Sequence, residues 1–182
     1  MSGRYEIRFS GAGGQGLILA GVIMAEAASI FDGKQAVQSQ SYGPEARGGA
    51  SKSEVIIADG PIDYPKATRV DALLALTQEA CDKYSHDLKE GGVLLIDSDL
   101  VKKQPAGNFK VVAFPIINTA KNDVGREIVA NIVALGAMVA LTEVVSKDAA
   151  EKAVLSRVPE AFVDLNKKAF QMGYDKAIAA RK

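Results

Sequence analysis

The residues best suited to chemistry begin with a cluster of glycines near the N-terminus. Gly11–Gly16 (GAGGQG) fits the pattern G-x-G-x-x-G and stands between a strand-like pattern and an apolar helix-like pattern. Glycines in such a place allow a tight turn, so that free backbone N–H groups at the helix start can meet a phosphate. The candidate binding residues of this glycine loop are Gly11, Gly13, Gly14, Gln15 and Gly16.

Three interpretations of the glycine loop are open. A bound NAD or FAD would also need an acidic residue at the end of the second strand, but that strand runs into Ser39–Ser41. Asp32 has roughly the right spacing, yet it falls before the strand and beside Gly33, where a turn is the simpler explanation. The second interpretation is tight packing of helix on strand without a ligand. The third, which we favour, is an anion or cofactor phosphate shared with a partner.

A second candidate loop follows the second predicted strand. Residues 40–49 (QSYGPEARGG) combine an aromatic ring, a charge pair and three glycines at the C-terminal end of a strand, where open α/β sheets bind ligands. Taken alone, the segment is more typical of a plain turn with a solvated Glu45–Arg47 pair. The Arg47 guanidinium could nonetheless hold a phosphate or carboxylate through two hydrogen bonds. The candidate residues of this second loop are Tyr42, Glu45, Arg47, Gly48 and Gly49.

The other reactive side chains are isolated from one another. Cys81 is the only cysteine, which excludes an internal disulfide and any four-cysteine metal or iron–sulfur site built from this chain. His86 is the only histidine and is interpreted as a surface helix residue. Asp97 and Asp99 follow a buried strand and are interpreted as turn or cap residues. We therefore predict no catalytic residue and no metal ligand.

The elements that position these loops alternate between strands and helices. Strands are expected at 5–10, 36–40, 52–58, 72–76, 93–97 and 110–114, and helices at 17–28, 78–89, 125–145, 148–157 and 162–180. Gly91 and Gly92 are expected to end the helix 78–89. This order predicts a three-layer α/β/α fold with a mostly parallel sheet, a Rossmann-like first βαβ unit and C-terminal helices. No long linker divides residues 1–182, so we expect a single domain.

Composition narrows the classes of partner. The chain has 22 basic and 22 acidic residues, so no net field favours nucleic acid or an anionic membrane. No apolar run reaches the roughly 18 residues that span a bilayer, and the N-terminus lacks a signal-like apolar segment, so we expect a cytoplasmic protein. The predicted helix 125–145 is apolar on most sides. We therefore expect an exposed apolar patch on this helix or on the glycine-loop helix, and self-association of the isolated chain.

Five segments together resemble the gamma subunit of 2-oxoacid:ferredoxin oxidoreductases, the family of pyruvate, 2-oxoglutarate and branched-chain 2-oxoacid enzymes. They are GAGGQG at 11–16, SYGPEARGG at 41–49, VDALLAL at 70–76, LKEGGVLLIDS at 88–98 and NIVALGA at 131–137. The resemblance implies a non-catalytic subunit that binds no cofactor by itself. Its partners would be alpha and beta subunits carrying thiamine diphosphate and a ferredoxin-like subunit carrying iron–sulfur clusters.

In such a complex a 2-oxoacid is oxidatively decarboxylated to its acyl-CoA while ferredoxin is reduced. The resemblance implies that this domain lies over the active-site entrance and helps to enclose coenzyme A. The glycine loop would then face a partner or the coenzyme A phosphates, and the second loop would reach toward the active site. Three alternatives stay open: a beta-type subunit of indolepyruvate oxidoreductase, a free-standing nucleotide-binding oxidoreductase, and a purely structural assembly or interaction module.

Overall fold

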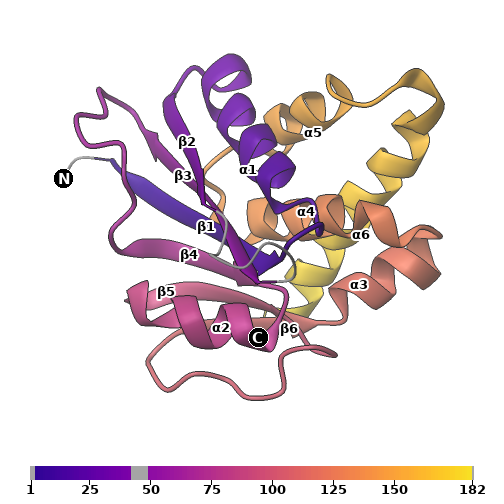
Figure 1. The fold of residues 1–182 in the computed structure, drawn as a ribbon. Helices are drawn as coiled ribbons and strands as arrows, with labels where there is room; N and C mark the ends of the chain where they lie inside the picture. The colour runs from indigo at the N-terminus through magenta and orange to yellow at the C-terminus, as the bar shows by residue number, and fades with distance from the viewer. Residues whose placement is uncertain (1–2, 42–48, 182) are drawn as a thin grey trace.

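The computed structural model describes residues 3–41 and 49–181, which form a six-stranded sheet with helices on both faces (Figure 1). The strands are β1 (Tyr5–Ala12), β2 (Gln35–Ser41), β3 (Ala50–Ala58), β4 (Val70–Ala75), β5 (Leu88–Asp97) and β6 (Lys110–Phe114). The longer helices are α1 (Leu17–Glu26), α2 (Gln78–Tyr84), α4 (Ala130–Thr142), α5 (Lys147–Leu155) and α6 (Val163–Ala180). Short helical turns are η1 (Ala27–Phe31), η2 (Ser85–Asp87), α3 (Ile116–Asn118), η3 (Thr119–Val124), η4 (Glu127–Val129) and η5 (Glu160–Phe162).

The strand order is β2-β3-β1-β4-β5-β6, and β1, β4, β5 and β6 run parallel. The predicted mostly parallel α/β fold is confirmed. β3 runs antiparallel to both of its neighbours and separates β1 from β2. The two parallel strands of the β1–α1–β2 unit are therefore not adjacent, unlike the neighbouring strands of a dinucleotide-binding unit.

The sheet has an apolar core on each face, and the two cores differ in size. Helices α1, α4, α5 and α6 cover one face (Figure 1), and Ile7 and Phe9 of β1 belong to the apolar core on that face. Helix α2 covers the other face, where a smaller core holds Leu73 and Cys81. Burial raises the pKa of the Cys81 thiol to about 11, with Asp82 adding to the shift. An uncharged, fully buried thiol is a packing residue and not a nucleophile.

Helix α4 lies between the sheet and α6. Every residue from Ala130 to Leu141 is buried. A Cβ on Gly136 would come within 3.0 Å of the carbonyl carbon of Phe170, and one on Gly173 within 2.7 Å of that of Val133, so the two helix backbones touch at these glycines. The helix is shorter than the predicted 125–145. Gly125 (φ 110°) and Glu143 (φ 52°) adopt left-handed backbone that an α-helix cannot contain.

The predicted helix 78–89 is wrong in its second half. It begins as expected, with the Thr77 hydroxyl accepting a hydrogen bond from the N–H of Ala80 (3.2 Å), but it ends at Tyr84. Strand β5 then starts at Leu88 and runs through the glycine pair that was expected to stop the helix. Gly91 has φ 75°, and the pairing of β4 with β5 shifts in register here. The two glycines therefore form a strand irregularity.

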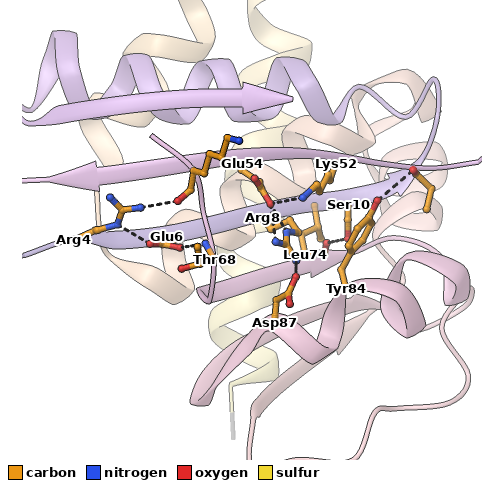
Figure 2. A network of polar contacts seen from close by, with 12 residues as sticks. Arg4, Glu6, Arg8, Ser10, Lys52, Glu54, Thr68, Leu74, Tyr84 and Asp87 are labelled. Carbon is orange, nitrogen blue, oxygen red and sulfur yellow. Dashed lines mark hydrogen bonds and ion pairs between the residues drawn. The ribbon is translucent and has the colours of Figure 1, made fainter. Parts of the chain in front are cut away.

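A network of charged side chains fills the α2 face of the sheet beside its small core (Figure 2). The Arg8 guanidinium, 1% exposed, donates to Glu54 (2.8 Å) and to Asp87 (2.7 Å). Lys52 donates to the same Glu54 oxygen at 2.8 Å. The Arg8 guanidinium carbon lies 5.2 Å from the centre of the Tyr84 ring, which closes the network from the α2 side.

Candidate functional site

The two predicted loops start from the same edge of the sheet, where the parallel strands end. Ala12, the last residue of β1, pairs with Ala50, the first of β3, and Ser41 at the end of β2 pairs with Lys52. The glycine loop and both ends of the second loop therefore lie close together. Gly49 precedes β3 directly. The candidate residues Tyr42, Glu45, Arg47 and Gly48 fall outside the described residues.

Two of the loop glycines are required by packing. A Cβ on Gly11 would lie 3.0 Å from the Leu17 side chain and 3.2 Å from that of Leu76. Gly16 has φ 74°, and a Cβ there would lie 2.6 Å from Nδ2 of Asn131. Tight packing of helix on strand therefore explains Gly11 and Gly16.

The other two glycines face outward. Gly13 and Gly14 are exposed, and a Cβ on either would meet nothing within 4 Å. Gly14 has φ 86°, so it also needs the freedom of glycine for its backbone. The Gln15 side chain accepts a hydrogen bond from the N–H of Ala12 at 2.7 Å and braces the turn from inside. The exposed backbone stands beside the first turn of α1, whose N–H groups have no partners within the helix. This part of the loop is open to an anion or a partner chain.

Asn131 supports the loop and was missed by sequence reasoning. Its side chain is 5% exposed, and its Nδ2 donates to the Gly16 carbonyl at 3.2 Å. Its Oδ1 accepts from the N–H of Ile132 at 2.9 Å. A single amide within an apolar helix was the available signal, because a buried polar group must find a partner.

The structure argues against a dinucleotide site. The Asp32 carboxylate accepts hydrogen bonds from the N–H (2.6 Å) and hydroxyl (2.7 Å) of Ser146, at the start of α5. Asp32 follows the far end of α1, so it lies away from the glycine loop. It cannot serve as the ribose-binding acid, and β3 occupies the place that the next parallel strand would take.

An apolar groove of about 620 Å³ opens beside the glycine loop. Gly14–Gly16, the start of α1, residues 126–132 and the α5–α6 connection line it. Three large apolar side chains at this groove are well exposed: Leu19 (40%), Ile128 (81%) and Phe162 (42%). Leu19 lies on the glycine-loop helix, Ile128 on η4 within the segment 125–145 and Phe162 on η5, so the exposed apolar side chains draw on both expected segments and on a third. Helix α4 itself is buried. The contribution of residues 157–166 was missed because only the tertiary fold brings them here.

Of the remaining candidates, Asp97 has a structural role. Asp97 is fully buried, and its carboxylate accepts from the N–H groups of Asp99 (2.8 Å), Leu100 (3.2 Å) and Ile117 (2.9 Å), which confirms its interpretation as a turn residue. His86 is exposed, on a short helical turn after α2. Within residues 3–41 and 49–181, no three His, Cys, Asp or Glu side chains are placed to share a metal ion. No helix in these ranges is both long and apolar enough to cross a membrane.

Comparison with known proteins identifies the family of the chain. The family model described as pyruvate ferredoxin/flavodoxin oxidoreductase matches residues 6–176. The chain belongs to this family. It is 54% identical over 176 residues to the 2-oxoglutarate synthase subunit KorC of Methanocaldococcus jannaschii, covering 96% of this chain and 94% of that one. The expected resemblance to the gamma subunit of these enzymes is confirmed.

Two solved structures resemble the fold closely. The gamma subunit of a keto/oxoacid ferredoxin oxidoreductase from Geobacter sulfurreducens is 83% identical, with a TM-score of 0.94 over the whole of both chains. The 2-oxoglutarate:ferredoxin oxidoreductase of Magnetococcus marinus, with 2-oxoglutarate, coenzyme A and succinyl-CoA bound, is 21% identical with a TM-score of 0.86. The match covers 98% of this chain but 32% of that one, so the same fold is there one part of a longer polypeptide.

Proposed function

We propose that this chain is the gamma subunit of a cytoplasmic 2-oxoacid:ferredoxin oxidoreductase that acts on 2-oxoglutarate, and that its glycine-loop edge helps to enclose coenzyme A. The observation that carries the substrate is the 54% identity, over nearly the whole of both chains, to a 2-oxoglutarate synthase subunit. In the assembled enzyme, 2-oxoglutarate would lose carbon dioxide, its acyl group would pass to the coenzyme A thiol, and the electrons would pass to ferredoxin.

The chemistry of that reaction lies in cofactors that this chain does not supply. Thiamine diphosphate and the iron–sulfur clusters would belong to the alpha, beta and ferredoxin-like subunits, since one buried cysteine cannot hold a cluster. The role left for this chain is to shape the entrance of the active site. Exposed Gly13 and Gly14 beside the start of α1 suit a phosphate-bearing substrate, because backbone N–H groups and the helix dipole favour anions.

Reconstitution tests the assignment. The full chain, tagged and co-expressed with the neighbouring reading frames, is expected to purify with subunits that reduce viologen when given 2-oxoglutarate and coenzyme A. The value of kcat/KM should be highest for 2-oxoglutarate, and the chain alone should show no turnover. A complex that prefers pyruvate would contradict the substrate, and turnover by the isolated chain would contradict the subunit role.

The coenzyme A contact is tested at Arg47 in the assembled complex. Arg47→Ala should raise the KM for coenzyme A about tenfold to a hundredfold, since a lost hydrogen bond to a charged group costs about 1.5–3 kcal/mol. Arg47→Lys should rescue only partly, because an ammonium keeps the charge but loses the planar fork. The matched control is Arg69→Ala, an exposed arginine at the opposite edge of the sheet, just before β4. Equal kinetics in all four proteins would remove the second loop from the coenzyme A site.

A further inference from the structure

We propose that the apolar groove beside the glycine loop is the docking site for an apolar segment of a partner subunit of the same oxidoreductase. The proposal rests on the proposed function and adds the surface by which this chain is held. It starts from the position of the groove, whose lining includes Gly14 and Gly16. A partner seated there would lie directly against the candidate site.

Four of the polar side chains that line the groove have partners within the chain, whereas the charged side chains of Arg126 and Glu127 lie exposed at its rim. Gln15 accepts from Ala12 (2.7 Å), Asn131 donates to Gly16 (3.2 Å), and Asn166 donates to the Phe162 carbonyl (2.9 Å). Arg157 donates through Nε to Glu26 at 2.8 Å. A sugar lying between the apolar walls of the groove would meet these four engaged side chains, and an anion would find Arg126 only beside the carboxylate-bearing Glu127. An apolar occupant needs no hydrogen-bond partners, and the exposed side chains Leu19, Ile128 and Phe162 of the groove are apolar.

The rim of the groove favours a protein surface as the occupant. Ile128, 81% exposed, is carried on η4 between exposed Glu127 and buried Val129. Clusters of exposed apolar side chains rimmed by polar residues are typical of protein interfaces. Arg126 and Glu127 are exposed neighbours of opposite charge at this rim. They suit a complementary charge pair on a partner better than a polyanion, which Glu127 would repel.

The comparisons explain why such a site is needed. In the Magnetococcus marinus enzyme the same fold is about a third of a longer chain, so a covalent tether keeps it near the rest. This chain instead spans 94% of the KorC relative and all of the Geobacter sulfurreducens gamma subunit, which leaves little length for a tether in those proteins. A separate subunit lacks the high effective concentration that a covalent linker supplies. The contacts at its interface must therefore provide the free energy that keeps it bound.

The test is co-purification of the full chain, tagged, with the thiamine-diphosphate-binding subunits co-expressed beside it. Ile128→Glu is expected to lower the amount of recovered partner at least tenfold, and Leu19→Glu should act in the same direction. The matched control is Ile30→Glu, since Ile30 is 66% exposed on η1, away from the groove. It should recover partner like the unmodified chain. Ile128 and Ile30 are both surface residues, so the unmodified chain, Ile128→Glu and Ile30→Glu should have the same melting temperature when each is measured without partners.

The outcomes separate this proposal from the proposed function. If the unmodified chain recovered no such subunits, the proposed function would fail and the docking site with it. If it recovered them and both groove variants did too, only the docking site would be overturned. Equal loss in the Ile30→Glu control would overturn it as well. The docking site would also be overturned by a groove variant that assembles fully but has a raised KM for coenzyme A. The same holds if the only effect of a groove variant, measured by sedimentation, is dissociation of a homodimer of this chain.

Discussion

The two faces of the central sheet are filled by different chemistry, and β1 carries both. Its residues Ile7 and Phe9 point into the apolar core beneath α1 and α4, whereas Glu6, Arg8 and Ser10 point toward α2. All of these side chains are buried. Alternation of apolar and polar residues in a strand usually marks a solvent-facing side. Here it marks two interiors, one held by apolar contact and one in which ion pairs lie beside a smaller apolar core.

The two interiors should fail in different ways. Apolar burial is non-directional, so the helix-covered face should be sensitive mainly to changes in volume. The α2 face depends on directional partners: Ser10 donates to the Leu74 carbonyl at 2.7 Å, and Glu6 accepts from the N–H of Thr68 at 3.0 Å (Figure 2). A buried charge that loses its partner is destabilising even when volume is conserved. Arg8→Met and Gly173→Ala separate these two cases.

Arg8→Met should have the largest effect. The change conserves much of the side-chain volume but leaves the buried Glu54 with Lys52 as its remaining cation. Breaking a buried pair by removing one partner costs about 3–5 kcal/mol. We expect about 3 kcal/mol, measured as a lower free energy of unfolding in urea, because Lys52 compensates in part.

The double variant Arg8→Met/Glu54→Leu is the control for charge. It removes the buried carboxylate as well, and replacing a whole buried pair by apolar residues is often close to neutral. The double variant should therefore be more stable than Arg8→Met alone. A single variant within about 1 kcal/mol of the parent would show that the α2 face tolerates unpaired charge.

Gly173→Ala tests the opposite face by adding volume without charge. A Cβ there would lie 2.7 Å from the carbonyl carbon of Val133, so α6 must move away from α4. Overpacking of this kind costs about 1–3 kcal/mol, although alanine would otherwise favour the helix. Gly60→Ala is the control, since its Cβ would meet nothing within 4 Å. If both variants unfolded at the same urea concentration, the two helices would be less closely packed than the structure places them.

Much of the fold could be predicted from the sequence, because its strands are apolar runs bounded by turn residues. The failures came where a local pattern had two explanations. Gly91 and Gly92 are as compatible with a strand irregularity as with a helix end, and only the pairing of β4 with β5 decides between them. The position of β3 between β1 and β2, antiparallel to both, could not be predicted from the order of strands and helices either. The loop between β2 and β3 allows β3 to run in either direction.

The candidate site was predictable only in its continuous segments. The glycine loop was found because its glycines lie together in the sequence, and its split into packed and exposed glycines required the contacts of Gly16 with Asn131. The groove combines Leu19, Ile128 and Phe162 from three distant segments. Each of these residues alone is an ordinary apolar residue, so no spacing rule could have joined them.

Arg157→Ala should have the smallest effect and extends the comparison to an ion pair near water. Arg157 and Glu26 join the α5–α6 connection to α1 at the surface of the helix-covered face, with side chains 40% and 24% exposed. Solvent screens such pairs, so we expect a loss below about 1 kcal/mol, well under that of Arg8→Met.

The hydrogen bond from Arg157 lowers the pKa of Glu26 below its ordinary value of 4.5, against the opposing effect of burial. A carboxyl group with a depressed pKa in the folded state contributes stability above its unfolded pKa and loses it as the pH falls through the folded value. The difference in unfolding free energy between the parent and Arg157→Ala should therefore be largest near pH 7 and shrink as the pH is lowered below 4.5. It should also shrink in high salt, whereas the Arg8→Met difference should change little, because its charges are buried. Urea titrations of both variants at neutral and acidic pH, with and without added salt, would measure this contrast. An Arg157→Ala loss as large as that of Arg8→Met, or one that persists at low pH, would contradict it.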